Sequence, residues 1–301
     1  HTAGTTIVVL PGIYREQVSL PGSGASGNPI VIQAQGSPGN PVMVSGADDF
    51  ANPALWVHVS GNVWQAASVT WSPNQVLADS VRLTASAAAP ASLPVNSFVW
   101  VSGQGLYVNV GGDNPGSHHA EVGRQAYGFS VSGRSWVTID GFTVSRTEDT
   151  GIRLANLSNN ITVSHNVVTF SFDYGIQAAN CTAILIDSNS SSDHFGSGIA
   201  LTSNSSGCTI QDNESFHNLT PNQANGFYGF GATNNLIQRN RLHDNAYNGS
   251  FLSTGSNNNV LRQNRAWNNG HQGIEDIFCT GSYHVGDVSY GNSWNGFAIE
   301  G

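Results

Sequence analysis

The chain has 301 residues, a net charge of −9 and only 10% charged residues, and all ten of its basic residues are arginine. The acidic balance argues against nucleic acid and anionic membranes as partners, and no apolar run approaches the roughly 18 residues that would insert into a membrane. Polarity comes from Asn, Ser, Thr and Gly, which indicates an extracellular or cell-surface β-protein. Asn-x-Ser/Thr sequons, such as those at Asn156 and Asn248, follow from this composition by chance or are glycan acceptors.

Residues 1–50 contain short runs of β-branched residues between Gly and Pro, as in TIVVLPGIYREQVSL and GNPIVIQAQG, and these predict strands and turns. Residues 51–126 break the pattern, hold four of the seven tryptophans and predict an inserted accessory β-element. Within them, residues 98–110 read FVWVSGQGLYVNV and predict a hairpin. The tryptophans are expected to pack the insertion onto its host; sugar stacking is the alternative.

Residues 127–301 repeat with a period of about 23 residues. One column consists of glycines, each followed by an apolar residue: Gly128, Gly151, Gly175, Gly198, Gly226, Gly249, Gly273 and Gly296. A second column keeps the same period: Asn166, Asn189, Asn213, Asn240, Asn264 and then Asp287. Both columns absorb one insertion near residues 217–225.

Three short strands and three turns in each unit predict one coil of a right-handed parallel β-helix, an all-β solenoid whose coils share one core. Equivalent residues on neighbouring coils would then lie about 4.8 Å apart. Stacked at that spacing, the asparagine amides of the second column are expected to form a hydrogen-bonded ladder.

The stretch GIRLANLSNNITVSHNVV and its successors resemble the right-handed parallel β-helix proteins of the pectate-lyase-like superfamily, including NosD-like repeats. The opening stretch resembles secreted carbohydrate-active members, and LWVHVSGNVWQA resembles an accessory element of β-helix glycosidases. The resemblance implies the fold and a polysaccharide partner, but this superfamily holds lyases, hydrolases, epimerases, adhesins and spikes. The sequence lacks the usual N-terminal capping helix and stops one strand into a coil, which predicts exposed edges that a longer chain or another molecule covers.

Two outward-facing columns border the face that is the usual substrate groove in the resembled superfamily. The first consists of the second residue after each glycine: Ser130, Arg153, Gln177, Ala200, Tyr228, Phe251, Glu275 and Ala298. The second consists of the residue two before each glycine: Asp149, Asp173, Gly196, Ala224, Tyr247, His271 and Trp294.

A first cluster contains Asp149, Asp173 and Arg153, with Asp193 and His194 one coil further on. Two carboxylates one coil apart match the separation of about 5 Å in retaining glycosidases, and their repulsion raises one pKa, which suits a general acid. Calcium bound through the carboxylate oxygens is one alternative, and a solvated acidic edge neutralised by Arg153 is another. No other metal or cofactor is predicted.

A second cluster contains His271 and Glu275, with Tyr228 and Phe251 one and two coils away as an aromatic surface for sugars or as an ordinary stacked ladder. Asp276 should point inward by strict alternation, and a bulge that turns it outward is one resolution. Cys181 and Cys208 lie on adjacent coils and could form a disulfide, whereas three cysteines cannot build a framework or a zinc site.

The predicted function is a secreted polysaccharide-degrading enzyme of glycoside-hydrolase type. Lysine is absent, Arg153 is the only arginine in the two columns, and no DPHD-like or polygalacturonase-like motif is present, which argues against a lyase, an epimerase and a polygalacturonase. A polysaccharide lyase stays open, as does a non-catalytic fibre, spike or adhesin that assembles end to end. The predicted catalytic residues are Asp149, Asp173, Asp193, His194 and Glu275, and the predicted substrate-binding residues are Arg153, Gln177, Tyr228, Tyr247, Phe251 and His271.

Overall fold

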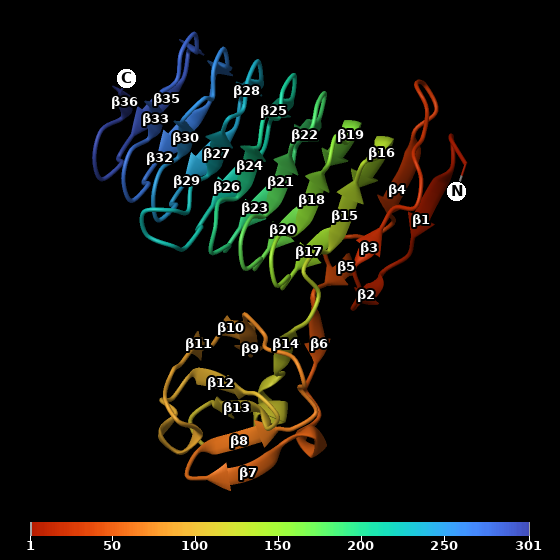
Figure 1. Ribbon diagram of the computed structural model, residues 1–301, viewed down its shortest axis with the longest axis vertical. Helices are drawn as coiled ribbons and strands as arrows, with labels where there is room; N and C mark the ends of the chain where they lie inside the picture. The colour runs from red at the N-terminus through yellow and green to blue at the C-terminus, as the bar shows by residue number, and fades with distance from the viewer. Residues whose placement is uncertain (1, 301) are drawn as a thin grey trace.

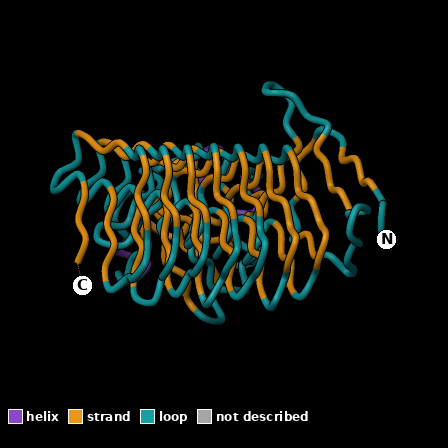
Figure 2. Tube along the Cα trace, turned by 90° about the horizontal axis from the view of Figure 1, so that it is seen from above, coloured by secondary structure: helices purple, strands orange, loops and turns teal. Residues whose placement is uncertain are grey.

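The computed structural model describes residues 2–300, and Figure 1 shows a right-handed solenoid of parallel strands with a smaller β-element attached below it. The prediction of a right-handed parallel β-helix is confirmed. Three parallel sheets of nine strands each run the length of the solenoid, and successive coils follow one another as a regular row in Figure 2.

Each coil contributes one strand to each of the three sheets. Sheet 1 contains β1 (Thr6–Val9), β4 (Ile30–Ala34), β16 (Ser135–Asp140), β19 (Asn159–Ser164), β22 (Leu185–Asp187), β25 (Thr209–Gln211), β28 (Leu236–Gln238), β31 (Val260–Arg262) and β34 (Tyr283–Val285). Sheet 2 contains β2 (Gly12–Tyr14), β5 (Val42–Ser45), β17 (Thr143–Ser145), β20 (Val167–Thr169), β23 (Ser190–Ser192), β26 (Glu214–Phe216), β29 (Arg241–His243), β32 (Arg265–Trp267) and β35 (Val288–Tyr290). Sheet 3 contains β3 (Val18–Ser19), β15 (Phe129–Ser132), β18 (Ile152–Ala155), β21 (Ile176–Ala179), β24 (Ile199–Thr202), β27 (Phe227–Phe230), β30 (Ser250–Ser253), β33 (Ile274–Ile277) and β36 (Phe297–Glu300).

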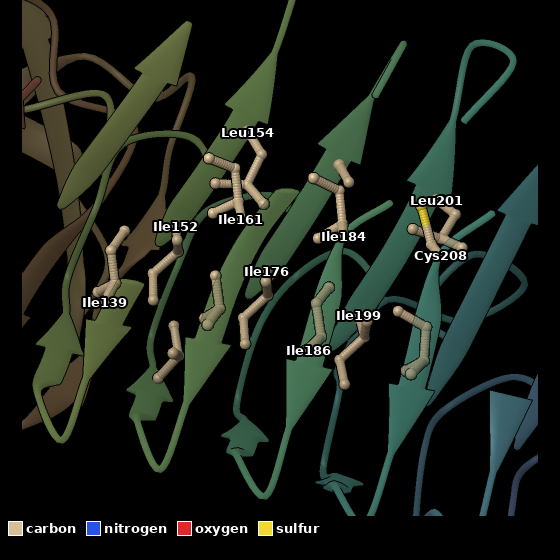
Figure 3. Close-up of a cluster of buried hydrophobic side chains, with 14 of the residues drawn as sticks. Ile139, Ile152, Leu154, Ile161, Ile176, Ile184, Ile186, Ile199, Leu201 and Cys208 are labelled. Carbon is tan, nitrogen blue, oxygen red and sulfur yellow. The ribbon is translucent and has the colours of Figure 1, made fainter. Parts of the chain in front are cut away.

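The core is a stack of aliphatic side chains that alternate with outward-facing residues along each strand. Ile152, Ile176 and Ile199 are in register on adjacent strands of sheet 3 and are fully buried, and Figure 3 shows their side chains as a repeating row near Ile139 and Ile186 of sheet 1. Burying one such side chain contributes about 1.5–3 kcal/mol, and repeating the position on every coil makes the core continuous.

The predicted asparagine ladder is present. Nδ2 of Asn189 donates to Oδ1 of Asn213 at 3.0 Å, and Nδ2 of Asn213 donates to Oδ1 of Asn240 at the same distance. The ladder runs from Asn166 to Asn264 and ends on a carboxylate oxygen of Asp287. The side-chain oxygens of the ladder also accept hydrogen bonds from main-chain N–H groups. These buried amides therefore satisfy main-chain donors in the turn between sheets 1 and 2.

A second ladder, which the sequence analysis did not identify, follows the turn between sheets 2 and 3. Nδ2 of Asn218 donates to Oδ1 of Asn245 at 2.7 Å, and the series continues through Asn269 to Asn292. On the preceding coil the same position holds His194, whose N–H donates to Asn218.

Residues 47–123 leave the solenoid after sheet 2 and return to it as a separate β-element. Its four-stranded sheet contains β6 (Ala47–Asp49), β14 (Glu121–Gly123), β9 (Val76–Ala78) and β10 (Val81–Arg82). Its five-stranded sheet contains β11 (Thr84–Ala85), β12 (Ser97–Val101), β13 (Gly105–Asn109), β8 (Val63–Ala66) and β7 (Val57–Ser60). Three short 3-10 helices complete it: η1 (Pro53–Leu55), η2 (Pro90–Ser92) and η3 (Pro115–His118).

The tryptophans of this element are structural. The indole N–H groups of Trp56, Trp64, Trp71 and Trp100 all donate to main-chain carbonyl oxygens, and their rings belong to or pack against one apolar cluster. Buried or half-buried indoles with satisfied N–H groups indicate packing rather than an open sugar platform.

Asp276 points into the solenoid, so an outward bulge is not formed. β33 stays in register with β30, with Asp276 opposite the buried Leu252, and the Asp276 side chain is buried. Its Oδ2 lies 3.1 Å from Nε2 of His284, whose Nδ1 lies 3.4 Å from Oδ2 of Asp287. A cationic imidazole between two carboxylates compensates for burying the negative charge.

The three cysteines are free thiols in the structure, so the disulfide between Cys181 and Cys208 is not formed. Burial raises the pKa of Cys181 to about 12 and that of Cys208 to about 11. Residues 2–300 contain no helix that is both long and apolar enough to cross a membrane.

Candidate functional site

A hollow of about 770 Å³ lies where the inserted element meets the turns that lead into sheet 3. The insertion contributes Asn74, and the loop near residues 217–225 contributes Thr220 and Gln223. The solenoid turns between them contribute Glu148, Asp149, Asp173, Phe172, Phe195 and Gly196. Three carboxyl groups from two adjacent coils therefore gather in one hollow.

Asp149 and Asp173 lie directly above one another, as their sequence spacing predicts. The N–H of Asp173 donates to the carbonyl oxygen of Asp149 at 2.9 Å, and the N–H of Gly196 continues the series by donating to Asp173. Burial and the charge of Asp149 raise the pKa of Asp173 to about 6, against a smaller lowering effect of Arg153. Asp173 is therefore suited to keep its proton at mildly acidic pH and to act as a general acid.

Glu148 is a third carboxyl group of the hollow, and sequence reasoning missed it. It accepts N–H donors from Asn74 and Gln75, which belong to the insertion, so it also ties the insertion to the solenoid. Burial raises the pKa of Glu148 to about 7 in spite of these hydrogen bonds. Its only sequence signal is its position beside Asp149.

A second anchor joins the same two parts of the chain. The Arg82 guanidinium donates to the carbonyl oxygens of Ser171 and Asp193 at 2.9 and 2.7 Å and lies over the rings of Phe170 and Phe195. With Glu148 it holds the insertion against the turns that carry Asp149 and Asp173. The wall of the hollow is thereby fixed at two points.

Arg153 and Gln177 lie in register on the outer face of sheet 3 beside the two aspartates. Nη1 of Arg153 donates to the hydroxyl oxygen of Tyr127 at 2.5 Å, and the guanidinium also lies 5.1 Å from the centre of the Tyr127 ring. Burial raises the pKa of Tyr127, and the charge of Asp149 adds to this effect. Gln177 makes a long hydrogen bond of 3.4 Å to Thr202 and borders neither hollow.

A second hollow of about 260 Å³ continues from the first and shares Asp173, Gly196 and Gln223 with it. Aromatic side chains surround this second hollow: Tyr174, Tyr228, Tyr247 and Phe251. The rings of Tyr228 and Phe251 stack with centres 5.8 Å apart, and Tyr247 meets Phe251 edge to face. Asp173 thus lies between an acidic hollow and an aromatic one, which is an arrangement that could hold sugar units on both sides of a bond.

His271 and Glu275 are linked through Asn248, one coil earlier. Nδ2 of Asn248 donates to Glu275 at 2.6 Å, and Oδ1 of Asn248 lies 3.0 Å from Nδ1 of His271. Burial raises the pKa of Glu275, whose side chain is only 2% exposed. The His271 ring stacks on Tyr247, so this cluster supports the aromatic hollow from behind instead of lining it.

His194, which the sequence predicts as a catalytic residue, lies inside the solenoid and lines neither hollow. Its Nδ1 accepts the N–H of Ser171, and its Nε2 donates to Oγ of Ser191 at 3.0 Å. Burial lowers the pKa of His194 to about 3, which keeps the ring neutral. His194 occupies an asparagine position of the second ladder and accepts a main-chain N–H as those asparagines do.

Asp193 also lies outside both hollows. Its Oδ2 accepts a hydrogen bond from Ser192 at 2.6 Å, and its carbonyl oxygen accepts from Arg82 of the insertion. Residues 2–300 contain no group of three His, Cys, Asp or Glu side chains arranged to hold a metal ion.

Comparisons with solved structures show the fold. XylC, solved in complex with xylose, aligns over 95% of this chain and 65% of its own with 14% identity and a TM-score of 0.68. The periplasmic alginate epimerase AlgG aligns over 57% of this chain and 47% of its own with 21% identity and a TM-score of 0.45. An alginate lyase from Paenibacillus sp. str. FPU-7 aligns over 98% and 92% with 12% identity and a TM-score of 0.44.

The chain therefore spans less than two thirds of the length of XylC and about half that of AlgG. No curated protein matches the sequence. The model of the family described as "Right handed beta helix region" matches residues 127–287, which is more than half of the chain. The chain belongs to this right-handed β-helix family.

Proposed function

We propose that the protein is a secreted glycoside hydrolase that uses Asp173 and Asp149 to cleave a polysaccharide or its oligosaccharides. The stacking of these two carboxyl groups in one hollow, with the pKa of Asp173 raised to about 6, is the observation that carries the proposal. Asp173 is the general acid that protonates the glycosidic oxygen. Asp149 is the carboxylate that attacks the anomeric carbon from the adjacent coil.

The spacing of about 4.8 Å between coils favours a retaining mechanism, for which the two carboxyl groups stand about 5–5.5 Å apart. Attack by Asp149 forms a glycosyl ester while the Asp173 proton goes to the leaving oxygen. Asp173 then accepts a proton from water, the water oxygen attacks the anomeric carbon, and the Asp149 ester is released. The stereochemistry at the anomeric carbon is retained.

The charges of the hollow favour a neutral sugar over a uronate. Glu148, Asp149 and Asp173 line it together with uncharged residues, and the nearby Arg153 is engaged with Tyr127. A uronate carboxylate placed beside the Asp149 carboxylate would be repelled, and a lyase would need cations at this point. The aromatic hollow on the other side of Asp173 offers ring surfaces to a neutral sugar.

The test compares Asp173→Asn and Asp149→Asn with the parent protein on neutral oligosaccharides, beginning with xylo-oligosaccharides because XylC was solved with xylose. Asp173→Asn should lose activity by about 10²–10⁴-fold, the range for loss of a proton-transfer group. Asp149→Asn should lose at least as much, because it removes the nucleophile. Asp193→Asn is the matched control, since Asp193 lines neither hollow, and it should keep its activity. Full activity in Asp173→Asn or in Asp149→Asn would refute the assignment of these two residues as catalytic. A parent protein that is inactive and polymerises would favour the non-catalytic fibre.

A further inference from the structure

Two arginines of adjacent coils lie opposite one another on the outer face of sheet 2. Arg241 of β29 pairs in register with Arg265 of β32, and like charges in such positions destabilise a sheet. Glu214 on the preceding coil compensates Arg241 with an ion pair of 3.0 Å. For Arg265, no carboxylate among residues 2–300 lies within ion-pair distance, and its neighbour on the next coil is Val288.

These two arginines border a hollow of about 450 Å³ at the turn between sheets 1 and 2. Arg239, Gln263 and Gly286 line it as well. Arg239 donates to Asp212 on the preceding coil, so the acidic partners all lie on one side of the hollow. The chain has only ten basic residues and a net charge of −9, which makes three guanidinium groups around one hollow a local departure from its overall charge.

A row of aromatic rings lies beside the arginines on the same outer face. Phe216, His243, Trp267 and Tyr290 are in register on four successive strands, each two residues after the Glu214, Arg241, Arg265 and Val288 positions. Neighbouring rings lie within 10° of parallel. The last ring of the row, Tyr290, is 53% exposed.

We propose that this face is a second glycan-binding site that binds a uronate-bearing polysaccharide. It is distinct from the two hollows that share Asp173. A uronate carboxylate would enter the arginine hollow and accept charge-assisted hydrogen bonds from Arg265 and Arg241. The sugar that carries the carboxylate would rest against the aromatic row at Trp267 and Tyr290. The hollow can bind one anionic group at a time from a polymer whose charges are widely spaced. A densely charged partner such as nucleic acid would be repelled by the net negative charge of the protein.

The two sites differ in the sugar that they favour, a neutral one beside Asp173 and an anionic one in the arginine hollow. β29 is three coils further along the solenoid than β20, whose following turn carries Asp173, which separates the sites by about 14 Å along the axis. A chain with neutral sugars and occasional uronates could therefore occupy the groove with a neutral segment and the arginine hollow with a uronate. Because the arginine site makes no use of Asp149 or Asp173, it stands or falls independently of the proposed hydrolysis.

Isothermal titration calorimetry on the full chain tests the site with oligogalacturonate, a neutral oligosaccharide of equal length and inorganic sulfate as probes. Arg265→Gln and Arg241→Gln should each weaken oligogalacturonate binding by about tenfold, the loss expected for one hydrogen bond to a charged group. Neutral-oligosaccharide binding should not change. Arg262→Gln is the control, because it removes an equal charge from an exposed position on sheet 1, outside the hollow.

Oligogalacturonate affinity that is unchanged in both hollow variants would overturn the inference, as would the absence of oligogalacturonate binding in the parent. Sulfate binding as tight as oligogalacturonate binding would also overturn it, since the site would then hold a simple anion and no glycan. Circular dichroism melts of each variant confirm that the solenoid is intact. Loss of binding without loss of hydrolysis of neutral oligosaccharides separates this site from the groove.

Discussion

Gly196 gives the Asp173 carboxylate the space that it occupies. The N–H of Gly196 donates to the Asp173 carbonyl oxygen at 2.9 Å, and a Cβ at position 196 would lie 2.5 Å from Oδ1 of Asp173. Real Cβ atoms do not approach an oxygen so closely, so any larger residue there must displace the carboxylate or the turn. Asp149, Asp173 and Gly196 occupy the same position on three successive coils, and the third of them therefore has to be a glycine.

Gly196→Ala should reduce hydrolysis by about 10²-fold, the cost of moving a reacting group by about 1 Å. The change is measured as kcat/KM on the best neutral oligosaccharide. Gly39→Ala is a matched control, because a Cβ at position 39 meets nothing within 4 Å. Unchanged activity in Gly196→Ala would show that the position of Asp173 has no bearing on the reaction.

The pH dependence of hydrolysis should follow Asp173. Its pKa is raised to about 6, so the acid form is present below pH 6 and is lost above it. The rate should therefore fall as pH rises through about 6, and a pH profile of kcat/KM measures this limb. Asp173→Asn should abolish the limb together with most of the activity, whereas a limb that persists in that variant would belong to another group.

The stability of the C-terminal coils should depend on pH through His284. Hydrogen bonds to Asp276 and Asp287 raise the folded-state pKa of His284 from 6.5 to about 9. A raised histidine pKa gives stability that is fully present below pH 6.5 and is lost as pH rises through 9. Thermal melts between pH 6 and 10 should show this loss.

His284→Gln should remove that pH dependence and lower the free energy of unfolding by about 1–2 kcal/mol at pH 6, a value reduced for solvent screening of a half-buried group. His165→Gln is the control, since that imidazole is mostly exposed and contacts a single carboxylate, Asp140. Parallel pH profiles of stability for the parent and His284→Gln would contradict the role of the buried ion cluster.

Removing one step of the asparagine ladder should be costly. Asn213 accepts from both the N–H and the Nδ2 group of Asn189 and donates to Asn240 and to the carbonyl oxygen of Ile186. Asn213→Ala leaves these buried groups unpaired and should destabilise the protein by about 2–4 kcal/mol. Urea denaturation measures the loss, and Asn62→Ala at an exposed position of the insertion is the control.

The sequence alone determined the fold and much of the candidate groove. Because the sequence repeats with a strict period, equivalent residues of successive coils stack at the spacing between strands. The recurring glycine and asparagine positions were therefore enough to predict the solenoid, the ladder from Asn166 to Asn264 and the stacking of Asp149 on Asp173. Alternation along a strand predicts which side chain faces the core, and it correctly predicted Ile152 inside and Arg153 outside.

Only the tertiary structure decided what happens where the period is broken. Glu148 joins the hollow because Asn74 and Gln75, more than 70 residues earlier, present their N–H groups to it, and no local pattern encodes that contact. His194 appeared to lie in an open loop, yet it fills an asparagine position in the interior, because a neutral imidazole can accept a main-chain N–H as an amide does. Asp276 follows the alternation and is buried, since His284 from another sheet supplies its counter-charge. Periodic contacts can be predicted from one sequence, whereas contacts between distant and non-equivalent residues depend on how the chain packs in three dimensions.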